Sequence, residues 1–174
     1  MINRILIKEL KDKIGEEVVL AGWVNTRRDH GQLIFLDLRD ASGAVQVVVA
    51  PGPAHSLADT LRLAWVIEVI GQVNRRPDKM INPEIKNGEI EIVIKEIKVL
   101  NEAETPPFDL TGDGREISEE TRLKYRYLDL RRRRLKKNLW LRHRAVKLIR
   151  DYLDERGFIE IETPILTKST PEGA

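Results

Sequence analysis

The stretch LIFLDLRDASGAVQVVVA, residues 33–50, contains two runs in which apolar side chains occupy every second position. The alternating positions are Ile34, Leu36 and Leu38 in the first run and Val45, Val47 and Val49 in the second. Because successive side chains of a β-strand point to opposite faces, this spacing predicts two strands that each bury one face. Phe35 and Gln46 then point away from the core.

The same kind of pattern extends outward through residues 17–99, as short β-rich runs punctuated by Gly, Pro and Asp. The expected strands are residues 18–28, 33–40, 44–50, 65–75 and 89–100, with a short helix at 54–62. Other small barrels also contain five short strands, but a helix after the third strand favours an OB-fold. The predicted fold class is therefore a mainly β, five-stranded OB-fold barrel with one helix.

The face opposite the predicted core carries side chains suited to nucleic acid. Phe35, Gln46 and Glu91 fall on outward positions of three strands, with two arginines and a histidine at one edge. An exposed ring can stack an unpaired base, while Gln and Glu address base edges. The face of Arg28 stays open, because Gly22 can mark a bulge that shifts the alternation. Each residue alone is explained as well by packing or solvation, but together they favour reading of single-stranded bases.

The composition narrows the class of protein without identifying a partner. The 174 residues include 30 Lys and Arg, 28 Asp and Glu, three widely spaced histidines and no cysteine. This excludes disulfides, thiolate catalysis and cysteine zinc sites, and no His, Asp and Glu spacing predicts a metal site. No apolar run resembles a signal peptide or a bilayer span, so we expect a cytoplasmic protein without a membrane partner.

A change of composition after residue 100 predicts a second part of the chain. NEAETPPFDLTGDG, residues 101–114, suits a linker, and residues 122–144 hold eleven Lys or Arg against one acid, a local charge of +10. A helix is expected from Asn138, closed by Gly157, followed by a strand at 158–163. The predicted organisation is a barrel domain at residues 1–104, a linker and basic hinge at 105–137, and the first part of a further domain at 138–174.

Three strings make the chain recognisable. They are GWVNTRRDHGQLIFLDLRD (22–40), RLKYRYLDLRRRR (122–134) and RGFIEIETPILTKSTPEGA (156–174). In this order and spacing they resemble the N-terminal part of bacterial-type aspartyl-tRNA synthetases of class II, ending just after motif 1. The asparaginyl and lysyl relatives share the barrel, but these strings fit the aspartyl branch better. The resemblance implies an OB-fold anticodon-binding domain followed by the α/β start of a class II catalytic domain.

The resemblance also implies roles for single residues of the barrel. The family's anticodon contacts fall on Arg28, Phe35, Gln46 and Glu91, where Phe35 stacks under an anticodon base and Gln46 reads the central uridine. His30, with the loop 77–83 around Lys79, implies the non-discriminating type, which also charges the asparagine tRNA. The alternative for His30 is an ordinary turn residue before a glycine.

Residues after 138 carry roles of a different kind. Gly157, Phe158 and Pro164 match motif 1, which builds the homodimer interface of the family. Glu172, in the loop 170–174, matches the glutamate that helps hold the amino group of aspartate, although a lone glutamate in such a place is ordinarily only solvent-exposed.

Catalysis is not expected from these residues alone. The resemblance implies aspartate activation with ATP and Mg²⁺ in the full-length enzyme, but motifs 2 and 3 have no counterpart here, and no catalytic or metal-binding residue is assigned. The expected activity of the chain is binding of tRNA(Asp), and of tRNA(Asn) if the interpretation of His30 holds. The alternatives are a free-standing, non-catalytic tRNA-binding protein and a general binder of single-stranded nucleic acid.

Overall fold

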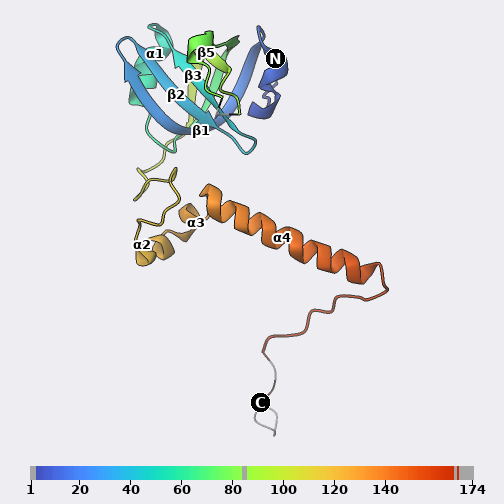
Figure 1. Cartoon of the computed structure of the whole chain (residues 1–174). Helices are drawn as coiled ribbons and strands as arrows, with labels where there is room; N and C mark the ends of the chain where they lie inside the picture. Colours follow the sequence, from blue (N-terminus) through green and yellow to red (C-terminus); the bar gives the residue numbers. More distant parts are fainter. Residues whose placement is uncertain (1–2, 84–85, 167, 169–174) are drawn as a thin grey trace. The chain divides into compact units, whose positions relative to one another are not determined.

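The computed structural model describes residues 3–83, 86–166 and 168. The chain divides into two compact units, Met1–Pro107 and Phe108–Ala174. The first unit is a β-barrel and the second contains the helices α2, α3 and α4 (Figure 1). Within the described ranges, no helix is both long and apolar enough to cross a bilayer.

The first unit is a closed barrel with strand order β1-β2-β3-β5-β4. Its elements are η1 (Ile7–Lys13), β1 (Glu17–His30), β2 (Leu33–Arg39), β3 (Ala44–Val49), α1 (Pro53–Thr60), β4 (Val66–Arg75), η2 (Asp78–Met80) and β5 (Ile90–Asn101). Neighbouring strands are antiparallel except β3 and β5, which pair in parallel. The predicted five-stranded OB-fold with a helix after the third strand is confirmed.

The predicted alternation of buried positions is also confirmed. Ile34, Leu36 and Leu38 of β2 are buried, as are Val45, Val47 and Val49 of β3 and Ile90 and Ile92 of β5. The residues between them are only partly buried and lie on the outer face. The core parity therefore places Phe35, Gln46 and Glu91 on the outside of the barrel.

Strand β1 is long enough to pair with two neighbours. Residues 17–23 pair with β4 and residues 23–30 with β2, and the register to β2 shifts between Val24 and Thr26. The first strand therefore contains the suspected irregularity, but it lies between Val24 and Thr26 and not at Gly22, which pairs regularly with Ile67 of β4. Gly22 is required for another reason, since a Cβ there would lie 2.4 Å from the backbone oxygen of Arg39.

One buried carboxylate, that of Asp40, helps to attach the N-terminal segment to the barrel. Asp40 accepts hydrogen bonds from the backbone N–H groups of Ile7 at 2.9 Å, Ser42 at 2.7 Å and Gly43 at 3.0 Å. Burial acts to raise the pKa of Asp40, but the hydrogen bonds from Ile7, Ser42 and Gly43 outweigh it and lower the pKa below its ordinary value. This contact holds η1, which buries Ile7 and Leu10 in the core.

The second unit contains α2 (Glu119–Lys124), α3 (Arg126–Asp129) and α4 (Arg133–Asp154). Ser118 caps α2, since its hydroxyl accepts from the Thr121 N–H at 3.3 Å. Helix α4 begins at Arg133, so the predicted start at Asn138 was too late by more than one turn. The Arg, Leu and Lys residues before Asn138 are strong helix formers, and they extend the helix without a side-chain cap.

The basic tract is organised around a single buried carboxylate. Asp129, whose side chain is 0% exposed, pairs with Arg122 and Arg126 at 3.1 Å each and with Arg132 at 2.9 Å. The Arg132 side chain is also fully buried and donates to the Gly112 carbonyl at 2.9 Å. Burial acts to raise the pKa of Asp129, but Arg122 and Arg132 outweigh it and lower the pKa. Residues predicted to be a charged hinge therefore contain an ordered ion cluster.

The end of α4 confirms one prediction and contradicts another. Gly157 has φ +80°, and the Phe158 N–H donates to the Leu153 carbonyl at 3.1 Å, which is the Schellman type of helix end. The strand expected at 158–163 was wrong, since these residues are exposed and pair with no other strand among the described residues. Strands are stabilised by hydrogen bonds to a neighbouring strand, and the described part of the second unit provides none.

Candidate nucleic-acid interface

Two rows of side chains cross the outer face of the barrel. In one row, Arg28 of β1 lies opposite Phe35 of β2, which lies opposite Val48 of β3. In the second row, the order is Thr26, Asp37, Gln46, Glu91 and Asn74, taken from β1, β2, β3, β5 and β4. Because side chains of directly paired residues point to the same side of a sheet, the side chains of each row lie next to one another across the outer face. The strand pairing thus brings together the four residues predicted as anticodon contacts.

Phe35 supplies the aromatic surface of this face. It is partly buried, lies outside the hydrophobic core cluster, and contacts the imidazole of His30 in a T-shaped arrangement with centroids 5.6 Å apart. His30 is exposed at the end of β1, next to Gly31, whose φ is +61°. The pair gives an aromatic surface that includes the middle residue of the first row, and an unpaired base can stack on such a surface.

Arg28 is held on the outer face by Asp37. Its guanidinium Nη2 lies 3.1 Å from Asp37 Oδ1, and the Thr26 hydroxyl donates to Asp37 Oδ2. The Arg28 side chain remains 51% exposed, so it is oriented but still free to meet a phosphate or a base. Sequence reasoning gave Asp37 no role, although it shares the outward parity of Phe35.

Gln46 and Glu91 meet at the seam between β3 and β5. Gln46 Nε2 donates to Glu91 Oε2 at 3.4 Å, and Arg76 Nε lies 3.7 Å from the same oxygen. Arg76 follows directly on β4 and was not predicted. Its position could have been noticed in the sequence, because Arg76 comes directly after β4, the strand that pairs with Glu91 through Asn74.

The remaining predicted residues lie elsewhere in the chain. Lys79 is exposed in η2, and none of the hydrogen bonds or ion pairs found among the described residues joins it to the outer-face rows. Gly157, Phe158 and Pro164 belong to the second unit, and Glu172 lies outside the described residues.

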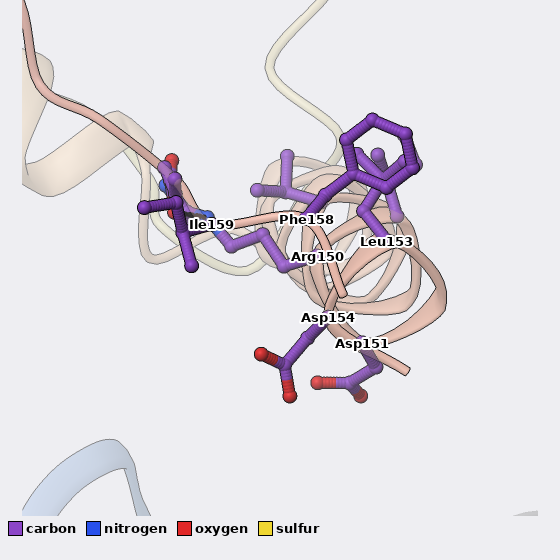
Figure 2. Close-up of a pocket in the computed structure, with 9 residues that line it drawn as sticks. Arg150, Asp151, Leu153, Asp154, Phe158 and Ile159 are labelled. Carbon is purple, nitrogen blue, oxygen red and sulfur yellow. Dashed lines mark hydrogen bonds and ion pairs between the residues drawn. The ribbon is translucent and has the colours of Figure 1, made fainter. Parts of the chain in front are cut away.

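A pocket of about 490 Å³ lies at the end of α4. Its apolar lining comes from Val146, Ile149, Leu153, Phe158 and Ile159, and its charged lining from Arg150, Asp151, Asp154 and Glu160. Figure 2 shows the Phe158 ring beside Leu153, with the carboxylates of Asp151 and Asp154 directed to the other side. The pocket combines residues of α4 with the segment that follows its last turn.

Comparison with known families agrees with both units. Residues 18–100 match the OB-fold nucleic acid binding domain, and residues 118–174 match the class II tRNA synthetases for D, K and N. The chain is therefore similar to class II tRNA synthetases in its second unit and to nucleic-acid-binding OB-folds in its first. It is 56% identical over 164 residues to an aspartate–tRNA(Asp/Asn) ligase of Syntrophomonas wolfei, covering 92% of the chain and 28% of that relative. An aspartate–tRNA ligase of Staphylococcus aureus is 51% identical over 164 residues, again with 92% and 28% covered.

Solved synthetases share the fold. An asparaginyl-tRNA synthetase from Pyrococcus horikoshii matches with a TM-score of 0.75 and 26% identity, covering 95% of the chain and 37% of that structure. An aspartyl-tRNA synthetase from Entamoeba histolytica matches with a TM-score of 0.83 and 22% identity, covering 95% and 40%. The chain thus spans about 28% of the length of the curated synthetases that it matches.

Proposed function

We propose that the barrel binds the anticodon of an aspartate-accepting tRNA, as the tRNA-binding part of an aspartate–tRNA ligase. The observation that carries the proposal is the outer-face arrangement of two register pairs on adjacent strands, Arg28 with Phe35 and Gln46 with Glu91. In this role Phe35 stacks under a base, the Gln46–Glu91 pair forms the part of the site that addresses a base edge, and Arg28 meets the backbone. The similarity to aspartate–tRNA ligases over 92% of the chain supports the choice of tRNA.

The test is binding of anticodon stem-loop RNAs that differ only at the central anticodon position. We expect preference for uridine there, and Phe35→Ala should weaken binding by about 5- to 150-fold, since stacking contributes roughly 1–3 kcal/mol per base. Phe158→Ala is the matched control, because it removes an exposed ring from the second unit. Equal affinity for any single-stranded RNA would refute the proposal and favour the general binder.

The wider assignment places this chain within an ATP-dependent enzyme. We place aspartate activation, with ATP and Mg²⁺, in the full-length protein in the cytoplasm, with Glu172 holding the amino group of aspartate. Among the described residues no three His, Asp or Glu side chains gather as a metal site, so these residues do not fit the ion and no catalytic step is assigned to them. Aminoacylation by the product of the complete reading frame would separate a ligase from a free-standing tRNA-binding protein.

Two further assignments rest on residues outside the two rows. We propose that His30 and Lys79 allow charging of tRNA(Asn) as well as tRNA(Asp), a choice supported by relatives named as tRNA(Asp/Asn) ligases. We also propose that Gly157, Phe158 and Pro164 contribute to a homodimer interface. The domain bounds that accompany these assignments are residues 1–104, 105–137 and 138–174. Failure of the full-length enzyme to charge tRNA(Asn) would contradict the first, and a monomeric full-length enzyme would contradict the second.

A further inference from the structure

An isolated glutamine is an ambiguous reader of pyrimidines. Its carbonyl oxygen accepts and its amide nitrogen donates, and a half-turn of the amide exchanges the two. Uracil presents an N3–H donor flanked by acceptors, whereas cytosine presents an N3 acceptor beside an amino donor. A freely turning Gln46 would therefore accommodate either base. Selection between them requires something to hold the amide in one orientation.

Glu91 supplies that constraint. The two residues are register partners across the parallel β3–β5 seam, and Gln46 Nε2 lies 3.4 Å from Glu91 Oε2. A carboxylate only accepts hydrogen bonds, so the turned amide would place its carbonyl oxygen against a negative charge. The orientation with Nε2 toward Glu91 is consequently favoured, and Gln46 Oε1 becomes the fixed acceptor.

Glu91 is itself held in place. Arg76 Nε lies 3.7 Å from Glu91 Oε2, and the two side chains are only 10% and 17% exposed. Charges shielded from water interact more strongly than charges on an open surface, so this ion pair restrains the carboxylate. The carboxylate on the other side of Gln46, Asp37, is engaged by Thr26 and Arg28.

We propose that Glu91, restrained by Arg76, sets the Gln46 amide so that the pair selects a base with an N3–H donor, uracil, over cytosine. This inference rests on the proposed anticodon binding and assigns Glu91 and Arg76 as positioning residues for the base reader. Cytosine with its N3 opposite the fixed Oε1 would set one acceptor against another, and an unpaired group of this kind costs roughly 5- to 150-fold in affinity.

The test is Glu91→Gln, measured as the ratio of affinities for stem-loops with U and with C at the central anticodon position. The amide introduced by this substitution can donate as well as accept, so it no longer fixes the amide of Gln46. We expect the U-over-C ratio to fall about tenfold, mainly through a gain for the C hairpin. Glu89→Gln is the matched control, since Glu89 precedes the same strand and pairs with Lys11 instead, and it should leave the ratio unchanged.

A double-mutant cycle distinguishes positioning from direct contact. In a Gln46→Ala background, Glu91→Gln should no longer change the U-over-C ratio, because the amide that it orients is gone. A ratio unchanged by Glu91→Gln in the otherwise intact chain, or an equal effect in both backgrounds, would overturn the inference. If the unmodified chain shows no U preference, the proposed function itself has failed, so the two failures are distinguishable.

Discussion

The two units have interiors of opposite kinds. Every buried apolar side chain among the described residues belongs to the barrel unit, which surrounds a single core. In the described part of the second unit, the buried residues are Gly114, Asp129 and Arg132. Along α4 no residue is buried, and Trp140, Leu148 and Ile149 are exposed. Burial of apolar area therefore stabilises one unit, while hydrogen-bonded charges order the helical turns that precede α4 in the other.

Removal of core volume from the barrel should give the largest effect. Leu36 is 0% exposed in the centre of β2, so Leu36→Ala should lower the free energy of unfolding of the barrel by about 3–4 kcal/mol. The measurement is chemical denaturation followed by amide signals of β2. Amide signals from α4 should not be lost in the same transition. Loss of both sets of signals at one denaturant concentration would show that the two units unfold together.

Removal of the central charge of the second unit should give the next largest effect. Asp129→Asn removes the negative charge that neutralises the buried Arg132 guanidinium, which should cost about 2 kcal/mol, less than for a fully enclosed pair because Arg126 is half-exposed. Hydrogen exchange over residues 119–132 should rise while the barrel is unaffected. Asp113→Asn is the control, since its ion pair with Arg115 is exposed.

Acid should weaken the same cluster. The pKa of Asp129 is lowered in the folded chain, so its stabilisation is complete above the ordinary value of 3.8 and is lost as the pH falls below it, through the folded-state pKa. Because the barrel retains its apolar core, amide signals of residues 119–132 should be lost at a higher pH than those of β2. Simultaneous loss in an acid titration would contradict the comparison.

The smallest effect on stability is expected on the outer face of the barrel. Asp37→Asn weakens a partly exposed ion pair with Arg28, which should change the free energy of unfolding by only about 0.5 kcal/mol. The same substitution releases the Arg28 guanidinium and should weaken stem-loop binding. A large loss of stability with unchanged RNA affinity would assign Asp37 to the fold instead of the interface.

The alternation of buried and outward positions along the strands was the feature most easily predicted from the sequence. Alternation in residues 33–50 identified the buried face of β2 and β3 because both strands lie regularly across the core. The face of Arg28 could not be derived, because the register shift between Val24 and Thr26 depends on pairing with β2. Asp37 and Arg76 were missed for a similar reason, since their importance comes from neighbours on other strands.

The structure of the second unit was harder to predict from the sequence, because it depends on particular contacts between side chains and not on a periodic pattern. A count of charges in residues 122–144 indicates repulsion, and it does not show that three arginines converge on Asp129. The strand expected at 158–163 has alternating apolar residues, but alternation supplies no pairing partner. Gly157 was predictable because a helix end of this type is a local signal.

The parallel seam between β3 and β5 is the shortest pairing of the barrel, with three residues of each strand in register. It joins positions 45 residues apart in the chain, and its first pair is Gln46 with Glu91. Transient opening of this seam would separate the two side chains before it disturbed the antiparallel strands. A base bound to Gln46, whose amide is held by Glu91, would oppose that opening. RNA binding should therefore slow hydrogen exchange of the backbone amides at the seam.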